Sequence, residues 1–381
     1  MNALFHNTRA MIPPVRHAFL FALLFIGISA LAQAGSDWQV IKVGNRDYLS
    51  TDNIAKFYGL SSSVIDPVAK KIRLENGQNE LELRLDSRET MINGVRNWFS
   101  FPVTEKDGQL LVSRVDLAKT LEPQLRPQMI ANLGKVRTVV LDPGHGGYDK
   151  GAISSYGREK DFALDVARQL RPMLQAKGFK VVMTRESDTF VPLELRARIA
   201  NAAKDCIFVS IHFNATDRDP AATGFEIYSL TPVGSPSSQD DDLALSFINR
   251  QAGSPVDAPS IELSTSIYHS MLGQIGEFDR GIKRARFAVL RLTKIPAVLV
   301  EGGFLTERGE SRLIANKDWR EKLAQAISVG IENYRDLAEN KKRPLVLADY
   351  RQMVLGQLTA HNATAPSANP PPAPVVIPVS N

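Results

Sequence analysis

Cysteine is almost absent from this chain of 381 residues, in which Cys206 is the only one. A single cysteine excludes any intrachain disulfide. Cys206 precedes the apolar triplet Ile-Phe-Val at residues 207–209, which is typical of a buried thiol, because apolar surroundings keep a thiol protonated and unreactive. We therefore predict that Cys206 is a core residue and not a nucleophile.

Dense basic stretches are also lacking. The formal net charge is only +5, and no Lys/Arg stripe is interleaved with aromatic residues, which argues against nucleic-acid binding. A hydrophobic content of 44% with 23% charged residues is that of a globular protein and excludes fibrous and wholly disordered classes. The small positive excess fits an anionic partner but is too weak to identify one.

The first 34 residues have the pattern of a secretory signal peptide. Arg9 and Arg16 precede an apolar run at residues 18–31, and small residues follow up to Ala34, as in such signals. We predict cleavage after Ala34 and export to the periplasm or cell envelope. The apolar run is short for a membrane span, so we expect no stable span after cleavage, and an uncleaved anchor is the alternative.

Residues 37–127 are predicted to form a small α+β module. Short strands at residues 39–43, 71–74 and 80–85 alternate with Asn-Gly and Asp-Gly pairs, which are hairpin signals. Short helices are expected at residues 51–58 and 113–120. On residues 44–49, 93–95 and 116–123 the module resembles the stalk domain at the N-terminus of some copper amine oxidases. It contains no His or Cys and hence no soft metal site, so we interpret it as a spacer or interaction module.

After a linker at residues 128–135, residues 136–338 alternate between strand and helix patterns. Apolar runs predict strands at residues 136–141, 180–184, 206–212, 224–228, 287–292 and 297–300. Apolar spacing predicts helices at residues 159–177, 193–204, 307–315 and 317–336, the first with a kink or break at Pro172. This order is typical of an α/β fold with a mostly parallel twisted sheet and helices on both faces.

A long insertion at residues 229–279 interrupts this alternation, with helical stretches at residues 243–251 and 261–275. Connections of this length inside a compact domain are usually functional. We expect His269, in the second stretch, at the surface. From residue 341 the chain loses periodicity, and residues 366–378 are rich in proline, so we predict a disordered tail at residues 341–381.

Four chemically useful side chains stand at the ends of these predicted elements. His145 follows the first strand within the sequence LDPGHGG at residues 141–147, His212 and Glu301 end two further strands, and Glu159 opens a helix. Ligands of open α/β sheets bind beyond the carboxyl ends of the strands, so we expect the four to converge. Two imidazoles and one carboxylate are a usual catalytic zinc set that keeps a fourth position for water. The other carboxylate is then left to act on that water.

Each of the four also has an unremarkable explanation when taken alone. His145 can be bonded to turn backbone, His212 can lie at the edge of the core, and Glu301 can be a solvated strand end. Glu159 can stabilise a helix N-terminus through the helix dipole. These explanations are independent of one another, whereas a metal site requires all four residues, so their joint occurrence favours the metal site.

The same residues lie in ordered motifs that resemble the zinc-dependent N-acetylmuramoyl-L-alanine amidases, a family of exported cell-wall enzymes. The motifs span residues 136–337 and include 141–147, Glu159, 184–185, 196–201, 210–215, 224–228 and 295–306. The resemblance implies that His145, Glu159 and His212 bind Zn²⁺ and that Glu301 is the catalytic carboxylate. Asn214 and the backbone of residues 144–147 are the candidates for holding the substrate. Glu307 departs from the family, which commonly has Asn at that position.

The resemblance further implies a function, namely hydrolysis of the amide bond between N-acetylmuramic acid and L-alanine in peptidoglycan by a zinc-activated water. Insertions at the place of residues 229–279 can block the metal in related amidases, so we hypothesise an autoinhibitory lid that a protein activator relieves. The alternative is that the insertion is a surface segment without an inhibitory role. Two other functions stay open, a zinc peptidase acting on wall stem peptides and a non-catalytic wall-binding protein on the same scaffold. The presence of all four site residues argues against the last.

Overall fold

Five of the strands predicted from apolar runs in residues 136–338 belong to a mixed β-sheet in the computed structural model, which describes residues 38–238, 253–353 and 355. The predicted signal peptide, the predicted helix at residues 243–251 and the proline-rich end of the chain lie outside the described residues. Six of the described strands follow one another in space in the order β13 (Lys180–Met183), β10 (Thr138–Pro143), β14 (Cys206–Asn214), β17 (Ala297–Phe304), β15 (Phe225–Leu230) and β16 (Asp279–Ala285).

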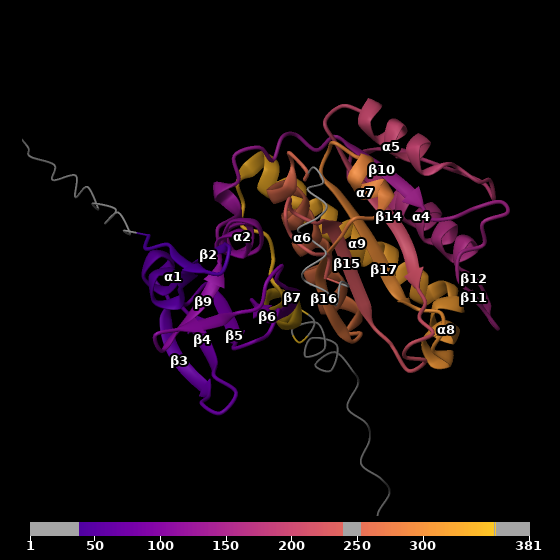
Figure 1. Ribbon diagram of the computed structural model, residues 1–381. Helices are drawn as coiled ribbons and strands as arrows, with labels where there is room; N and C mark the ends of the chain where they lie inside the picture. The colour runs from indigo at the N-terminus through magenta and orange to yellow at the C-terminus, as the bar shows by residue number, and fades with distance from the viewer. Residues whose placement is uncertain (1–37, 239–252, 354, 356–381) are drawn as a thin grey trace, which may run out of the picture. The chain divides into compact units, whose positions relative to one another are not determined.

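The pairing within this sheet is mostly parallel. β10 pairs in parallel with both β13 and β14, and β14 pairs in parallel with β17. β15 is antiparallel to β17, and β16 is parallel to β15. Figure 1 shows β10, β14, β17, β15 and β16 side by side with helices packed around them. The predicted α/β class with a mostly parallel sheet is confirmed.

Helices cover both faces of the sheet because buried side chains alternate along each strand. In β14, Val209 and Ile211 belong to a core shared with α4 (Glu159–Ala176), α6 (Asp257–Ile275) and α9 (Lys317–Asn340). On the opposite face, Phe208 packs with α5 (Leu193–Ala202) and α7 (Ala288–Leu292). A further helix, α8 (Arg308–Ala315), follows β17.

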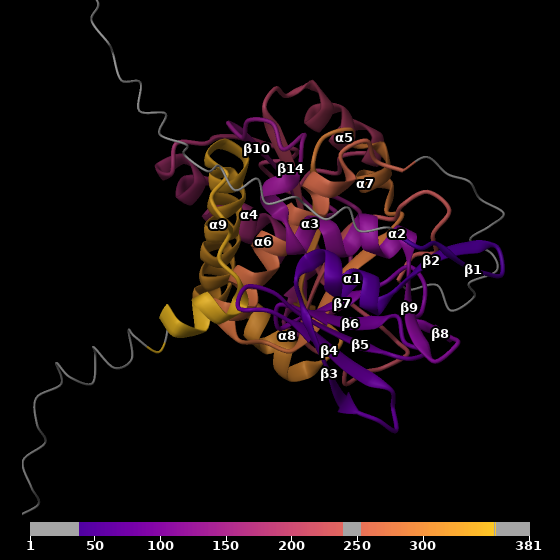
Figure 2. The same cartoon turned by 90° about the vertical axis from the view of Figure 1, so that its left-hand side faces the viewer.

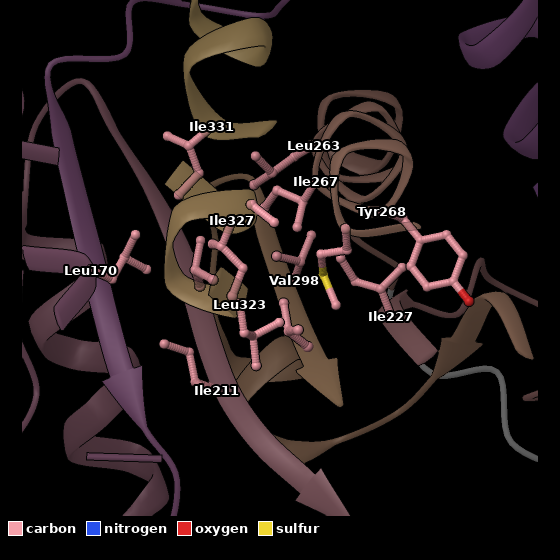
Figure 3. Packing of buried hydrophobic residues seen from close by; sticks show 14 of the residues in the cluster. Leu170, Ile211, Ile227, Leu263, Ile267, Tyr268, Val298, Leu323, Ile327 and Ile331 are labelled. Atoms are coloured by element: carbon pink, nitrogen blue, oxygen red, sulfur yellow. The ribbon is translucent and has the colours of Figure 1, made fainter. Parts of the chain in front are cut away.

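The first of these cores is filled by branched aliphatic side chains from the sheet and from three helices. Figure 3 shows Ile211, Ile227 and Val298 of the sheet facing residues of α6 and α9, and Figure 2 shows α9 running beside α4 and α6. Cys206 is buried in the second core, where burial raises the pKa of its thiol to about 11. The prediction that Cys206 is a core residue is confirmed, and the raised pKa agrees with the expectation that it is not a nucleophile.

The N-terminal module is built from two groups of strands and short helices. One group forms a small antiparallel sheet, in the order β1 (Ile41–Val43), β2 (Arg46–Ser50), β9 (Gln109–Ser113) and β8 (Thr104–Lys106). The other is a meander of β3 (Ser61–Asp66), β4 (Lys71–Glu75), β5 (Glu80–Arg84), β6 (Glu89–Ile92) and β7 (Val95–Trp98). The helical segments are α1 (Thr51–Tyr58), α2 (Arg114–Asp116), a π-helical turn (Leu117–Leu121), α3 (Glu122–Leu125) and a 3₁₀ turn (Pro127–Met129).

The module extends the main sheet instead of standing apart from it. β7 pairs with β16, so the described sheet continues to eleven strands, ending at β3. The backbone N–H of Arg96 donates to Asp279 Oδ2 at 2.7 Å, and Trp98 Nε1 donates to the carbonyl of Arg280 at 3.0 Å. The boundaries predicted for the two domains and their linker stay predictions.

The secondary structure differs from the prediction in two neighbouring segments. The strand predicted at residues 287–292 is wrong, because residues 288–292 form helix α7 and short apolar runs do not distinguish a strand from a helix. The neighbouring strand β16 was not expected, because its sequence DRGIKRA is basic. Two of its cations are buried and paired, Lys283 with Glu226 at 2.8 Å and Arg284 with Asp257 at 2.7 Å, and hydrophobic patterns do not reveal such pairs.

Helix α4 runs through Pro172 without the break that was one of the two expectations there, and a kink stays a prediction. A proline removes the bond to the carbonyl four residues earlier, here that of Arg168. Both residues are exposed, so water can satisfy that carbonyl. The loss of one hydrogen bond is therefore tolerated on the solvent side of the helix.

The segment from residue 341 is also partly ordered, in contrast to the predicted tail. Leu347 and Tyr350 are buried. The backbone N–H of Leu347 donates to Nδ1 of His269 at 2.9 Å. His269 is itself buried in α6, so the expectation that it lies at the surface is wrong, and burial together with the charge of Arg343 lowers its pKa to about 3.

Glycine at position 330 lets α9 approach α6 closely. A Cβ built at Gly330 would lie 2.4 Å from Cα of Ile267, a contact that the backbone cannot accept. We predict that Gly330→Ala lowers the free energy of unfolding by about 1–3 kcal/mol, although alanine favours a helix by about 1 kcal/mol over glycine. Urea unfolding tests this, with Gln325→Ala on the exposed side of α9 as control. An equal or higher stability for Gly330→Ala would contradict the close approach.

Glu262 is a buried carboxyl of α6 with one oxygen unpartnered among the described residues. Burial raises its pKa from 4.5 to about 8, opposed by a hydrogen bond from Ser266. Between those pH values the unfolded chain ionises Glu262 while the folded protein keeps the proton, so stability falls as the pH rises through this window. We predict that Glu262→Gln removes this fall, on the order of a few kcal/mol.

Urea unfolding at pH 5 and pH 8 measures the effect. The difference between the two pH values should shrink in Glu262→Gln and stay unchanged in the exposed variant Glu321→Gln. An unchanged pH dependence in Glu262→Gln would show that Glu262 ionises normally in the folded protein.

Candidate metal centre

The register of the sheet places two of the candidate side chains, His212 and Glu301, in one row with Glu226. His212 of β14 pairs with Glu301 of β17, and Glu301 pairs with Glu226 of β15. Paired residues of neighbouring strands point to the same face. This is the face that carries Phe208, α5 and α7, and the row lies near the carboxyl ends of the parallel strands, where the sequence led us to expect a site.

His145 and Glu159 reach the same point from a loop and a helix end. Nε2 of His145 lies 3.0 Å from Oε1 of Glu159, and Nδ1 of His212 lies 2.8 Å from the same oxygen. The possible ligand atoms of the three residues all lie within 4.8 Å of one another. The structure therefore brings together His145, Glu159 and His212, three of the residues singled out from the sequence.

The donor set fits a zinc ion in its chemistry and spacing. Imidazole nitrogen and carboxylate oxygen are ordinary zinc ligands, and ligands about 2.0–2.1 Å from a tetrahedral ion are about 3.3 Å apart. The distances of 2.8 and 3.0 Å are close to that value. Nδ1 of His145 lies 2.9 Å from Oδ2 of Asp149, a carboxylate contact that typically orients a metal-binding imidazole.

The loop that carries His145 has an unusual backbone conformation. His145 has a φ of 58°, a left-handed value that costs energy in a residue with a side chain. Two buried arginines hold the loop: Arg196 donates to the carbonyl of His145 at 2.6 Å, and Arg185 donates to the carbonyl of Gly144 at 2.7 Å. Arg196 also pairs with buried Asp142 at 2.8 Å. The two arginines thus supply hydrogen bonds to carbonyls of the loop, which regular secondary structure would otherwise supply.

Two glycines leave the space that the donor side chains occupy. A Cβ at Gly144 would lie 2.3 Å from the ring of His212. A Cβ at Gly151, which has a φ of 61°, would lie 2.4 Å from Oε2 of Glu159. Neither position can accept a larger residue without moving a donor. Gly144, within the sequence LDPGHGG, and Gly151, which follows it, therefore have a steric role in addition to allowing a turn.

The electrostatics of the site keep Glu159 ionised. Burial by itself raises the pKa of Glu159, but hydrogen bonds from His145 and His212 outweigh it and hold the pKa far below its ordinary value. Burial lowers the pKa of His145, whereas Glu159 and Asp149 raise it above its ordinary value and prevail. The ionised carboxylate of Glu159 therefore favours positive charge at the point where the three side chains meet.

Glu301 is adjacent to the donor set but differs from it in its environment. It is buried, and its Oε2 has no hydrogen-bond partner within the described ranges. Burial and the negative charges of Glu159 and Glu226 raise the pKa of Glu301 well above its ordinary value. Two neighbouring carboxylates with pKa values shifted in opposite directions are a mark of acid–base sites.

Asn214 lies at the end of β14, where its Nδ2 donates to Oε2 of Glu226 at 3.2 Å. Glu226 also pairs with Arg280 at 2.7 Å and with Lys283 at 2.8 Å. Asp149 and Glu226 were not singled out from the sequence. Asp149 lies four residues after His145, a spacing that could have suggested a partner, whereas nothing local to Glu226 indicates its position beside Glu301.

A cavity of about 660 Å³ opens over the donor set. Its walls are formed in part by Phe190, Leu193 and Phe287, and by His145, Glu159, His212 and Glu301 at the site itself. Helix α6 does not border it, since that helix belongs to the core on the other face of the sheet. The lid hypothesis for residues 229–279 is therefore wrong for residues 257–275.

Glu307 lies outside the donor set and caps α8, accepting the N–H of Glu310 at 2.6 Å.

These features define a class of protein, an α/β protein with a candidate mononuclear metal centre of two imidazoles and one carboxylate and a second carboxylate beside it. The comparison with known families is more specific. The sequence profile of the N-acetylmuramoyl-L-alanine amidase family matches residues 139–333. The chain belongs to this family.

Similar proteins are named N-acetylmuramoyl-L-alanine amidases. The chain is 33% identical over 240 residues to N-acetylmuramoyl-L-alanine amidase AmiC of Neisseria meningitidis, covering 58% of this chain and 57% of that one. It is 32% identical over 253 residues to N-acetylmuramoyl-L-alanine amidase AmiA of Escherichia coli K12, covering 61% and 87%. A crystal structure of N-acetylmuramoyl-L-alanine amidase from Clostridium difficile 630 is 34% identical, with 53% of this chain and 98% of that chain covered and a TM-score of 0.45.

The match covers only part of some relatives. This chain spans 57% of the Neisseria AmiC and 58% of an AmiC from Escherichia coli O6:H1. The match to the family profile begins at residue 139, after the N-terminal module. The likeness of that module to a copper amine oxidase stalk domain stays a prediction.

The contact between Asp149 and His145 gives a test of the donor set. We predict that Asp149→Asn weakens zinc binding by about 10–100-fold, because the imidazole loses the carboxylate that orients it and raises its basicity. Competition with a chromophoric chelator measures the affinity. Asp318→Asn, an equivalent change at an exposed position, is the control. Equal affinities for Asp149→Asn and the unaltered protein would show that Asp149 does not support a metal ligand.

Proposed function

We propose that the protein is a zinc-dependent N-acetylmuramoyl-L-alanine amidase, which hydrolyses the amide bond between the lactyl group of N-acetylmuramic acid and the L-alanine of the stem peptide. One observation carries the proposal: His145, Glu159 and His212 converge on one point, and Glu301 lies beside them in the same row of the sheet as His212. Family membership supports the choice of this amide over other substrates. Zinc is held by these three residues in this proposal.

Zinc bound there would lower the pKa of a water molecule to about 7 and polarise the substrate carbonyl. The three protein ligands leave the fourth position of a tetrahedral ion for water or substrate. Asp149 holds the ring of His145 through Nδ1, which leaves Nε2 as the ligand atom. Arg185 and Arg196 hold the loop, so the donor set is formed before substrate arrives.

Glu301 is the general base and then the general acid in this proposal. Its unpartnered Oε2 accepts a proton as water adds to the lactyl carbonyl, and the same proton passes to the nitrogen of L-alanine as the C–N bond breaks. Burial and neighbouring carboxylates favour the protonated form of Glu301, which suits the donation step. A cation at the donor set has the opposite effect on its pKa, which suits the acceptance step.

The substrate is held by groups that surround the cavity. Asn214, whose amide is oriented by Glu226, and the backbone of residues 144–147 are proposed to hydrogen-bond the substrate. The apolar side chains of Leu193, Phe287 and Val289 line the same cavity and keep water away from the reacting amide. Such a site, apolar with a few convergent polar groups, is the usual form of an enzyme pocket.

Peptidoglycan lies outside the cytoplasmic membrane, so the proposed function requires export. The predicted signal peptide supplies it, and we propose that the protein acts in the periplasm or cell envelope. Among the described helices, none combines the length and apolar character that crossing a membrane requires. A lid formed by residues 257–275 is excluded, because α6 belongs to the core. A lid formed by another part of residues 229–279, and an activator that relieves it, stay predictions.

Incubation of zinc-loaded protein with purified wall sacculi tests the proposal. We predict release of intact stem peptides that carry a free L-alanine amine, and loss of this release after treatment with a chelator. Glu301→Gln should bind zinc normally and lose about 10²–10⁴-fold in rate, whereas the exposed variant Glu321→Gln keeps its rate.

Product analysis separates the alternatives. Release of peptide fragments without the L-alanine amine would indicate a zinc peptidase. Binding of zinc-loaded protein to sacculi without any release would indicate a wall-binding protein, and either result would contradict the amidase proposal.

A further inference from the structure

Two exposed aromatic rings stand at the rim of the cavity and have no part in the chemistry described above. The side chain of Tyr148 is 78% exposed and that of Phe190 is 37% exposed. Their ring centroids are 4.4 Å apart with an interplanar angle of 31°. Large exposed apolar groups that are paired next to a site commonly mark a binding surface.

The two loops that carry these rings are braced against each other. Gly146 and Asp149 exchange backbone hydrogen bonds of 2.9 and 3.2 Å, which places Tyr148 at the tip of a tight turn. The N–H of Gly147 in this turn donates to Oδ1 of Asp188 at 2.8 Å, and buried Lys160 bonds both the carbonyl of Gly147 and Oδ2 of Asp188. The rings therefore stand on a fixed support.

The two loops also approach each other closely. A Cβ at Gly147 would lie 2.8 Å from the backbone nitrogen of Phe190, so the turn and the second loop are in contact where the rings begin. Phe190 also lines the cavity that contains the donor set. The aromatic pair therefore lies next to the metal site. A part of the substrate that extends out of the cavity can contact the two rings.

The charges around the pair favour a neutral occupant. The exposed charged side chains that neighbour the rings in the sequence are of mixed sign, with Lys150 on one loop and Glu186 and Asp188 on the other. Asp188 is paired with buried Lys160 at 2.6 Å. Lys160 and Arg185 are buried beneath the loops and donate to carbonyl oxygens, so they are not available to a carboxylate. A substrate part with carboxylates, such as the stem peptide, gains little here.

We infer that Tyr148 and Phe190 form a stacking platform for the sugar ring of the substrate, next to the amide that is cleaved. This rests on the proposed function, in which that amide joins a sugar-borne lactyl group to a peptide. The C–H face of a pyranose ring is apolar and its rim carries hydroxyls. An aromatic face attracts the C–H face of the sugar by dispersion, and the hydroxyl of Tyr148 can form hydrogen bonds with the sugar hydroxyls.

Binding of the two reaction products tests the inference without turnover. The probes are the disaccharide of N-acetylglucosamine and N-acetylmuramic acid without a peptide, and the free stem peptide, each titrated calorimetrically into zinc-loaded protein. We expect Tyr148→Ala and Phe190→Ala each to weaken binding of the disaccharide by about 3- to 10-fold and to leave binding of the stem peptide unchanged. Phe190→Tyr, which keeps the aromatic face, should restore the affinity.

Phe278→Ala is the matched control, because Phe278 is 54% exposed and does not line the cavity. Thermal unfolding of each variant confirms that it is folded. Three results would overturn the platform: no binding of the disaccharide to the unaltered protein, equal affinities in the alanine variants, or a loss confined to the stem peptide. Release of stem peptides from sacculi by the unaltered protein is measured separately, so failure of the proposed function is distinguishable from failure of the platform.

Discussion

The buried carboxylate of Glu159 lies between two imidazoles, and the rest of the site depends on this contact. Removing a carboxylate from water costs several kcal/mol unless charges and hydrogen bonds compensate. Here Oε1 meets His145, His212 and the N–H of Phe213, and Oε2 accepts the N–H of Ala152. The compensation requires the first residue of α4, a loop and a strand end to meet at one point. The same three side chains, His145, Glu159 and His212, can bind a divalent cation.

The fold provides that meeting point through ordinary packing. Apolar side chains at alternate positions of the strands pack against α4, α6 and α9 on one face of the sheet. This packing fixes the start of α4 at the carboxyl ends of the strands. The other face carries the row of His212, Glu301 and Glu226 under α5 and α7. The N-terminal module continues the same sheet through β7 and β16, so it is joined to the strand that holds the cations paired with Glu226.

Much of this could be predicted from sequence because apolar periodicity and position relative to strand ends are local signals. They were enough to identify the α/β class, most elements of the second domain, and the four residues that meet at the site. Pairs between distant buried charges are not local, so β16 with Lys283 and Arg284 was missed, as was Glu226. The core position of α6 was missed for a related reason, since a helix with Glu262 and His269 on buried sides resembles a surface helix in sequence.

The identity of the ion and its ligands is tested most directly by X-ray absorption at the zinc edge of the zinc-loaded protein. The account predicts a shell of nitrogen and oxygen at about 2.0–2.2 Å, with the scattering of two imidazoles and no sulfur. In His145→Ala one imidazole should be lost, while an alanine at an unrelated exposed position changes nothing. A shell with a single imidazole, or one made only of oxygen, would contradict the assignment of His145, Glu159 and His212 as the metal ligands.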